Sequence, residues 1–283
     1  MRFCGFFLTA AYYLTIMYLL NIEAVKIMRI VIKIGTSTLA YSTGHLNIRH
    51  IENFCKVVSD IKNAGYEVIV VSSGAVGMGM GKLSLNARPE RLTQKQAVAA
   101  VGQCELMYTY SRLFGEYNHT VGQILLTAQN VKDENQHQNF TSTVNELLDL
   151  GVIPIINEND SVAVNELIIG DNDTLAAIVA KSVRADRLII LSDIDGLFTA
   201  DPRKDKTAKL IPEITKITPE IKALADPGDS KLGTGGMVTK LEAAEIVMAC
   251  GCDMIIANGK DPAILYDILD GKQVGTKFTG ENK

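Results

Sequence analysis

Short aliphatic runs alternate with stretches of helical periodicity along the chain, and this alternation restricts the fold more than any other sequence feature. Arg29–Ile34 and Glu67–Val71 are runs rich in Val and Ile, and helical spacing of apolar residues separates them. Such runs are typical of parallel strands that are covered on both faces. Because the rhythm continues towards the C-terminus, we predict an α/β protein with a parallel sheet between layers of helices.

The predicted elements follow this alternation. Strands are expected at Arg29–Ile34, Glu67–Val71, Val121–Leu126, Val152–Ile156, Asp186–Ser192, Met254–Ala257 and Val274–Phe278. Helices are expected at Asn47–Asn63, Arg91–Phe114, Gln136–Leu150 and Thr174–Val183, and another begins at Met237. The charged segment Lys204–Asp229 contains three prolines and is expected to form an excursion with short elements. An isolated glycine inside a helix costs stability, so Gly102 indicates a close contact between helices.

The composition limits the class of protein. The chain has 283 residues, enough for one large α/β domain or two lobes, and its net charge is −4. Without a basic field and without tryptophan, the sequence offers no surface for nucleic acid. The five cysteines and four histidines show no zinc-site or other metal-ligand spacing. We therefore predict a cytoplasmic protein with no metal-ligand motif and no nucleic-acid partner.

The N-terminus carries an apolar run, Phe3–Leu20, of about 18 residues, which reaches the length of a membrane-spanning helix or of a signal peptide. No small-residue cleavage site follows it, and Met28 directly begins a predicted strand. We interpret residues 1–27 as an apolar N-terminal extension upstream of the natural start. A membrane anchor and a targeting peptide are the alternatives.

Two polar clusters lie in the stretch Val152–Ala177, at places where α/β proteins bind ligands. A predicted buried strand ends at Asn157–Asp160, and a second cluster, Gly170–Asp173, precedes the next helix. Strand ends that face helix starts are the usual ligand sites of open α/β sheets. An Asp at a helix N-terminus is also a common cap, but a cap accounts for one carboxylate and not for both clusters. We predict a functional site here, with capping as the alternative for Asp171–Asp173.

Lys33 ends a strand that is otherwise aliphatic, and burying its charge is costly unless it faces water or an anion. A lysine that reaches solvent from an edge strand is the alternative. After the next strand, Ser72–Gly81 is rich in glycine, which lets backbone N–H groups approach an anion, and Ser73 adds a hydroxyl group. The P-loop motif and G-x-G-x-x-G do not occur in the sequence, which argues against P-loop NTPases and standard Rossmann dehydrogenases.

The C-terminal part carries features suited to a nucleotide. Ser192 and Asp193 follow a strand and can hydrogen-bond a nucleotide, although a plain turn is the alternative. Gly233–Lys240 opens a helix with glycines that let a phosphate approach the free N–H groups. Lys33 and Lys240 come from opposite ends of the chain, with acidic groups between them. This set of lysines, acidic groups and glycine-rich turns suits phosphoryl transfer, whose transition state carries negative charge on the transferred group.

Six motifs, in order, give the chain a resemblance to the amino acid kinase family: VIKIGTS, VSSGAVG, INENDSV, GDND, LFTADPR and GTGGMVTK. The likeness spans about Met28 to Phe278. INENDSV with GDND points to the members that phosphorylate glutamate, rather than acetylglutamate, aspartate, carbamate or uridylate. The resemblance implies a three-layer αβα sandwich around a mostly parallel sheet of about eight strands. Residues 28–185 would form the glutamate-binding lobe, and residues 186–283 the ATP-binding lobe of the same kinase domain.

The resemblance also implies roles for individual residues. Lys33, Lys240 and Asp173 would be catalytic, with the lysines on the phosphate groups and Asp173 orienting both. Ser73, Asp160 and Asn172 would bind glutamate, and Asp160 would suit the α-ammonium group. The ATP-binding positions would be Lys33, Ser192, Asp193, Thr234, Gly235, Gly236, Met237, Val238, Thr239 and Lys240. ATP would bring Mg²⁺, held mainly by phosphate oxygens and waters.

The implied reaction is the ATP-dependent phosphorylation of the γ-carboxylate of L-glutamate to L-glutamyl 5-phosphate, the first step of proline biosynthesis. The resemblance further implies a homo-oligomer, feedback inhibition by proline, and hand-over of the labile product to glutamyl-phosphate reductase. Many bacterial members carry a C-terminal PUA domain, and we expect a short form without it because the chain ends at Lys283. Two alternatives stay open: another amino acid kinase with a different acceptor, and a sensor that binds amino acid and nucleotide without turnover.

Overall fold

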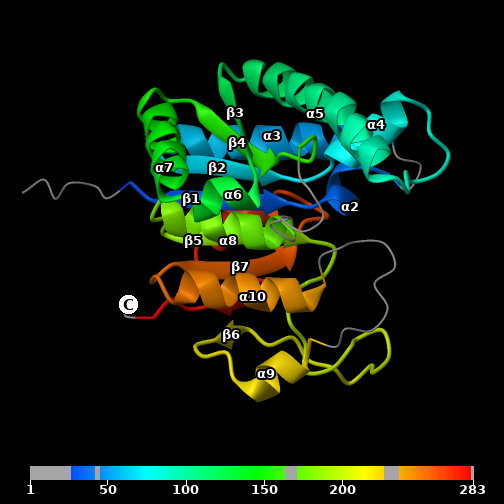
Figure 1. Ribbon diagram of the computed structural model, residues 1–283. Helices are drawn as coiled ribbons and strands as arrows, with labels where there is room; N and C mark the ends of the chain where they lie inside the picture. The colour runs from blue at the N-terminus through cyan, green and yellow to red at the C-terminus, as the bar shows by residue number, and fades with distance from the viewer. Residues whose placement is uncertain (1–26, 42–44, 163–170, 226–235, 282–283) are drawn as a thin grey trace, which may run out of the picture.

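An eight-stranded sheet forms the centre of the computed structural model, which describes residues 27–41, 45–162, 171–225 and 236–281 (Figure 1). The strand order is β3-β4-β2-β1-β5-β7-β8-β6, and among these pairs only β7 and β8 run antiparallel. The strands are β1 (Arg29–Ile34), β2 (Glu67–Ser72), β3 (Val121–Leu126), β4 (Ile153–Glu158), β5 (Arg187–Ser192), β6 (Glu213–Ile214), β7 (Asp253–Asn258) and β8 (Thr276–Phe278). The predicted mostly parallel sheet is therefore confirmed.

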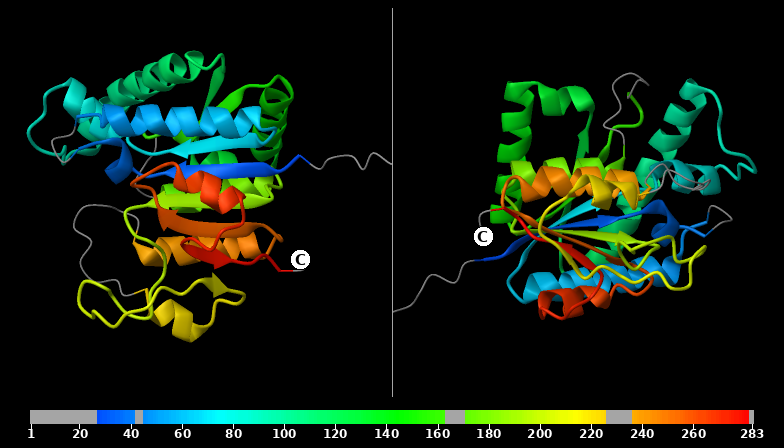
Figure 2. Two further views of the ribbon diagram at one scale, coloured as in Figure 1. Left: turned by 180° about the vertical axis from the view of Figure 1, so that it is seen from behind. Right: turned by 90° about the horizontal axis from the view of Figure 1, so that it is seen from below.

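Helices cover both faces of this sheet (Figure 2). α7, α8 and α10 pack on one face, and α3, α5 and α11 pack on the other. The described helices are α2 (Thr36–Leu39), α3 (Ile48–Asn63), α4 (Ala75–Lys82), α5 (Leu92–Gly115), α6 (Ala128–Lys132), α7 (Glu134–Asp149), α8 (Asn172–Ser182), α9 (Pro219–Ala223), α10 (Met237–Met248) and α11 (Ile264–Leu269). This arrangement is the αβα sandwich expected from the sequence.

The alternation of side chains along β1 decides which face of the sheet receives Lys33. β1 is hydrogen-bonded to β2 on one side and to β5 on the other, so it lies inside the sheet. Ile30 and Ile32 pack with the core beside α3, whereas Val31 packs with the core beside α8 and α10. Successive side chains in a strand point to opposite faces, so Lys33 faces α8 and α10. The alternative of an edge-strand lysine is wrong.

Each strand and long helix expected from the sequence lies within a few residues of its predicted place. The segment after β5 also forms the expected excursion with short elements, β6 and α9. Four helices were not predicted: α2, α4, α6 and α11. α4 contains the glycine-rich segment, where Gly74 adopts a φ of 106° and turns the chain from β2 into the helix.

Close packing between α4 and α5 depends on glycine. A Cβ atom on Gly102 of α5 would lie 1.7 Å from the carbonyl oxygen of Ala75, and one on Gly79 of α4 would lie 1.9 Å from that of Val98. Neither backbone position tolerates a side chain without moving the partner helix. The helix contact predicted at Gly102 is confirmed.

Gly102→Ala is expected to lower the free energy of unfolding by about 1–3 kcal/mol, the usual cost of overpacking. The reason is that the added methyl group must separate α4 from α5. Gly115→Ala is a matched control at the end of the same helix, where a Cβ would meet nothing within 4 Å. Urea unfolding of the two variants measures the difference, and equal stability would contradict the packing account.

Within the described ranges, no helix is long and apolar enough to span a membrane. Residues 1–26 lie outside those ranges, and so does nearly all of the expected N-terminal extension.

Candidate active site

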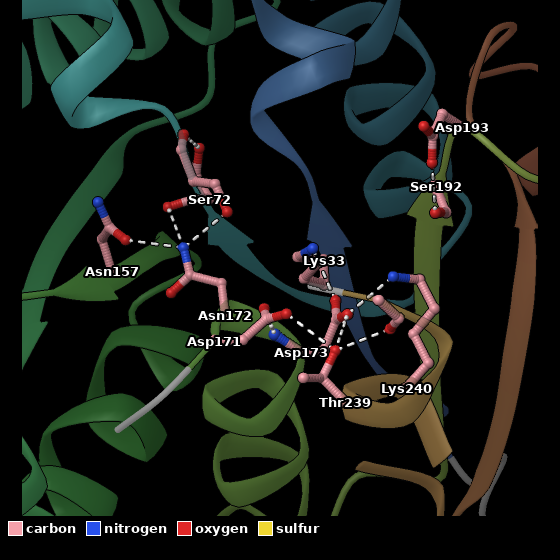
Figure 3. Close-up of polar contacts among 12 residues, drawn as sticks. Lys33, Ser72, Asn157, Asp171, Asn172, Asp173, Ser192, Asp193, Thr239 and Lys240 are labelled. Carbon is pink, nitrogen blue, oxygen red and sulfur yellow. Dashed lines mark hydrogen bonds and ion pairs between the residues drawn. The ribbon is translucent and has the colours of Figure 1, made fainter. Parts of the chain in front are cut away.

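Three charged side chains meet between the sheet and two helices, although they come from distant parts of the chain (Figure 3). Lys33 Nζ on β1 lies 2.6 Å from Asp173 Oδ1 on α8. Lys240 Nζ on α10 lies 3.0 Å from Asp173 Oδ2. One carboxylate thus binds both ammonium groups, one on each oxygen. The expected position of Asp173 between the two lysines is confirmed.

This lysine–aspartate triad is almost completely removed from solvent. The exposed fractions are 0% for Asp173, 4% for Lys240 and 7% for Lys33. Burial by itself raises the pKa of Asp173, but the charges of Lys33 and Lys240 and their hydrogen bonds outweigh it, so the pKa lies below its ordinary value. The carboxylate therefore stays ionised at neutral pH. The triad by itself carries one negative and two positive charges, so both ammonium groups share a single carboxylate.

Asp171 holds the N-terminus of α8 in place beside α10. Its Oδ1 accepts a hydrogen bond from the backbone N–H of Asp173 at 2.7 Å, so Asp171 is the N-cap of α8. Its Oδ2 accepts from the hydroxyl group of Thr239 at 2.9 Å, which ties the first turn of α10 to the same cap. The capping alternative is thus correct for Asp171. It does not describe Asp173, whose carboxylate is committed to the lysines.

A chain of amide hydrogen bonds lies beside the triad. Asn172 Nδ2 donates to Ser73 Oγ at 2.7 Å and to Asn157 Oδ1 at 3.1 Å. Asn157 Nδ2 in turn donates to Gln103 Oε1 on α5 at 2.9 Å. No described residue donates to the Oδ1 atom of Asn172, so this oxygen is left as an acceptor. The hydroxyl group of Ser73 accepts from Asn172 and keeps its own hydrogen for donation.

Asp160 follows β4 in a turn and is partly buried. Burial raises the pKa of this carboxyl group, and no cation of the described residues counteracts the shift. An ionised carboxylate in this position is therefore stabilised by a positively charged ligand. Asp160 follows the carboxyl end of the strand that carries Asn157, where parallel sheets bind their ligands.

Some of the residues expected to bind the nucleotide contact the triad, and others lie apart from it. Ser192 ends β5, and its hydroxyl group donates to Asp193 at 3.2 Å, apart from the lysines in Figure 3. Gly236 is the N-cap residue of α10, which then begins with Met237, Val238, Thr239 and Lys240. Thr239 and Lys240 contact Asp173 directly. Thr234 and Gly235 lie outside the described residues.

Sequence reasoning gave no individual role to three residues of this site. Asn157 lies inside the motif INENDSV, and its place at the strand end was the available signal. Asp171 belonged to the second polar cluster, with capping as the alternative, but its bond to Thr239 depends on how α8 and α10 pack. Gln103 lies on α5, and no local pattern connects it to Asn157.

The fold and this arrangement of charges define a class of protein. The family model described as amino acid kinase family matches residues 28–258. The chain belongs to the amino acid kinase family. Its relatives include glutamate 5-kinase of Clostridium perfringens, 52% identical over 257 residues that cover 89% of this chain and 96% of the relative. Glutamate 5-kinase of Listeria innocua is 53% identical over 259 residues, which cover 90% and 94% of the two chains.

Solved structures share the fold at much lower identity. Carbamate kinase from Giardia lamblia, bound to AMP-PNP, aligns with a TM-score of 0.62 and 20% identity over 90% of this chain and 99% of its own. Isopentenyl phosphate kinase of T. acidophilum aligns with a TM-score of 0.60 and 18% identity, over 89% and 99% of the two chains. These structural similarities support the αβα sandwich fold of this chain.

Proposed function

We propose that this protein transfers the γ-phosphoryl group of ATP to the γ-carboxylate of L-glutamate, which yields L-glutamyl 5-phosphate and ADP and begins proline biosynthesis. The buried triad of Lys33, Asp173 and Lys240 is the observation that carries the proposal. An anionic acceptor and an anionic phosphoryl group repel each other, so their reaction needs concentrated positive charge. Glutamate is chosen as the acceptor because this chain shares over half of its aligned residues with glutamate 5-kinases.

The chemical step follows from the charges of the site. A carboxylate oxygen of glutamate attacks the γ-phosphorus, and the bond from this phosphorus to the bridging oxygen breaks as ADP leaves. The carboxylate is already deprotonated at neutral pH, so no general base is required. Lys33 and Lys240 stabilise the negative charge of the transition state, while Asp173 keeps both ammonium groups in place before the substrates bind.

The hydrogen-bond donors and acceptors beside the triad fit an amino acid as the substrate that receives the phosphoryl group. Asn172 Oδ1 and the carboxylate of Asp160 are acceptors, as the α-ammonium group of glutamate requires. The hydroxyl group of Ser73 retains a hydrogen that it can donate to a carboxylate of the substrate. We assign Ser73, Asp160 and Asn172 to glutamate on this basis.

ATP is assigned to the C-terminal lobe, residues 186–283, and glutamate to residues 28–185. Ser192, Asp193 and the segment Thr234–Lys240 would contact the nucleotide, where the first turn of α10 offers N–H groups to phosphate. Mg²⁺ would arrive with ATP and neutralise charge on its phosphates. Phosphate oxygens and waters supply most of its ligands, which is compatible with described residues that hold no cluster of three metal-binding side chains.

The proposed function also implies partners and a cellular compartment. We propose that the protein is a cytoplasmic homo-oligomer, inhibited by proline, that hands its labile product to glutamyl-phosphate reductase. The absence of a disulfide among the described cysteines fits a reducing compartment.

Release of ADP from MgATP, measured with a panel of acceptors, tests the proposed function. L-glutamate should stimulate release, whereas aspartate, N-acetylglutamate, carbamate and UMP should not. Stimulation by another acceptor would favour a different amino acid kinase. ADP release that does not rise with any acceptor would favour the sensor, which binds without turnover.

Asp160→Asn is expected to raise the KM for glutamate by about 10- to 100-fold, the range of one lost hydrogen bond to a charged group. The kcat should change much less, because Asp160 contacts the ammonium group and not the reacting carboxylate. Burial raises the pKa of Asp160, and only its ionised form attracts the ammonium group. The wild-type KM should therefore rise as the pH falls through this pKa, and the variant should lose that dependence. Initial rates against glutamate concentration and pH measure both effects, and a normal glutamate KM in the variant would reject the assignment.

A further inference from the structure

We infer that Gln103, a residue of α5 to which no role is assigned, is a positioning residue that makes the site prefer an amino acid over a plain dicarboxylate. Together with the backbone N–H of Glu158, it holds the orientation of the Asn157 amide, and through it that of Asn172. This inference rests on the proposed function, because it names the feature that selects the α-ammonium group of the substrate.

The side chain of Gln103 is buried, with 8% of its surface exposed. Its Oε1 atom accepts the hydrogen bond from Asn157 Nδ2 at 2.9 Å, and this contact is itself buried. Its Nε2 atom finds no acceptor among the described residues. Among the described residues, the Gln103 side chain therefore makes one hydrogen bond, to Asn157. Burying an amide donor without a partner lowers the stability of the folded protein.

Two hydrogen bonds together determine which end of Asn157 faces Asn172. The backbone N–H of Glu158 donates to Asn157 Oδ1 at 2.9 Å, and Gln103 Oε1 accepts from the Nδ2 end, which points towards α5. In this orientation Asn157 Oδ1 also accepts from Asn172 Nδ2 at 3.1 Å. If the amide of Asn157 were reversed, two N–H donors would face each other at Asn172.

The orientation of Asn172 in turn decides what the site presents to a substrate. With Nδ2 bound to Asn157, to the Ser73 hydroxyl group and, at 3.4 Å, to the backbone carbonyl of Ser72, the oxygen of Asn172 is the group left for the ligand. An oxygen attracts an ammonium group, whereas a reversed Asn172 would present N–H donors and repel it. Gln103 therefore acts on substrate selection at a distance, through Asn157, without touching the substrate.

The backbone position of Gln103 is also fixed. The preceding residue, Gly102, packs so closely on α4 that a Cβ would lie 1.7 Å from the carbonyl oxygen of Ala75. Ser73 and Gly74, which lead into α4, belong to the same wall of the site. Gln103 is thus carried on a helix that packs tightly against α4, the helix that follows the hydroxyl group of Ser73.

The test compares L-glutamate with glutarate, which has the same two carboxylates and lacks the ammonium group. Dissociation constants are measured by isothermal titration calorimetry for the full chain and for Gln103→Leu, Gln103→Met and Gln103→Glu. Leu and Met remove the acceptor, whereas Glu keeps an oxygen facing Asn157. The stoichiometry of each titration reports the fraction of competent protein, so partial misfolding does not alter the ratio of the two constants.

Gln103→Leu and Gln103→Met should reduce the preference for glutamate over glutarate by about 3- to 10-fold, the range of one hydrogen bond between neutral groups. Glutarate affinity and the KM for ATP should stay within about twofold of wild type, and Gln103→Glu should largely restore the preference. An unchanged preference in both apolar variants, or equal losses for glutamate and glutarate, would overturn the inference. A wild-type chain that binds neither glutamate nor glutarate would instead overturn the proposed function.

Discussion

Lys33→Ala and Lys240→Ala are each expected to lower kcat by about 100- to 1,000-fold, the range found when one preorganised electrostatic contact to a transition state is removed. Both ammonium groups lie against Asp173 in a buried site, where charge is poorly screened and each lysine acts strongly on the phosphoryl group. The KM for glutamate should change much less, because charge builds up on the transferred group only as the reaction proceeds.

Steady-state rates at saturating MgATP and varied glutamate measure this split. Lys272→Ala is a suitable control, because Lys272 forms an exposed ion pair with Asp267 at 2.5 Å and should leave kcat unchanged. A wild-type kcat in either site variant would refute the catalytic role of that lysine. A large rise in KM at constant kcat would assign it to substrate binding instead.

Asp173→Asn is expected to have the largest effect on stability, a loss of about 3–5 kcal/mol, which is typical when one partner of a buried ion pair is removed. The substitution removes the carboxylate charge that contacts both buried ammonium groups. It also turns one amide N–H group towards a lysine. The same change should abolish most activity, since the lysines lose the group that aligns them. Urea unfolding at neutral pH measures the loss.

Acid titration of the wild type separates this electrostatic contribution from general damage. The folded pKa of Asp173 lies below its ordinary value, so its contribution to stability is present above the unfolded pKa and is lost as the pH falls through the folded one. Asp173→Asn should lack this part of the acid dependence. Asp267→Asn, in the exposed pair with Lys272, should cost no more than about 1 kcal/mol. Equal losses from Asp173→Asn and Asp267→Asn would contradict the role of the triad.

The sequence predicted the sheet and the triad well because both leave local signals. Aliphatic runs mark the buried strands, and a lysine among them, such as Lys33, has to find an anion when it is buried. The six motifs then placed Asp173 and Lys240 as its partners. Once the fold is assembled, the strand alternation that puts Val31 on the α8 side also puts Lys33 there.

The parts that escaped prediction depend on contacts between distant elements. α4 contains several glycines, which lower helix propensity, yet it is helical, and one of them, Gly79, lets it pack closely on α5. The same packing brings Gln103 to Asn157, 54 positions away along the chain. Periodicity on α5 marks which face is buried, and it carries no information about the hydrogen bond that a buried glutamine makes.

Trapping the product with hydroxylamine tests the central claim most directly. An acyl phosphate reacts with hydroxylamine to give a stable hydroxamate, which identifies a carboxylate as the phosphoryl acceptor. With L-glutamate and MgATP, the protein should form γ-glutamyl hydroxamate and ADP in equal amounts, and Lys240→Ala should reduce both. ADP formation without hydroxamate, or hydroxamate that does not depend on glutamate, would contradict phosphoryl transfer to this carboxylate.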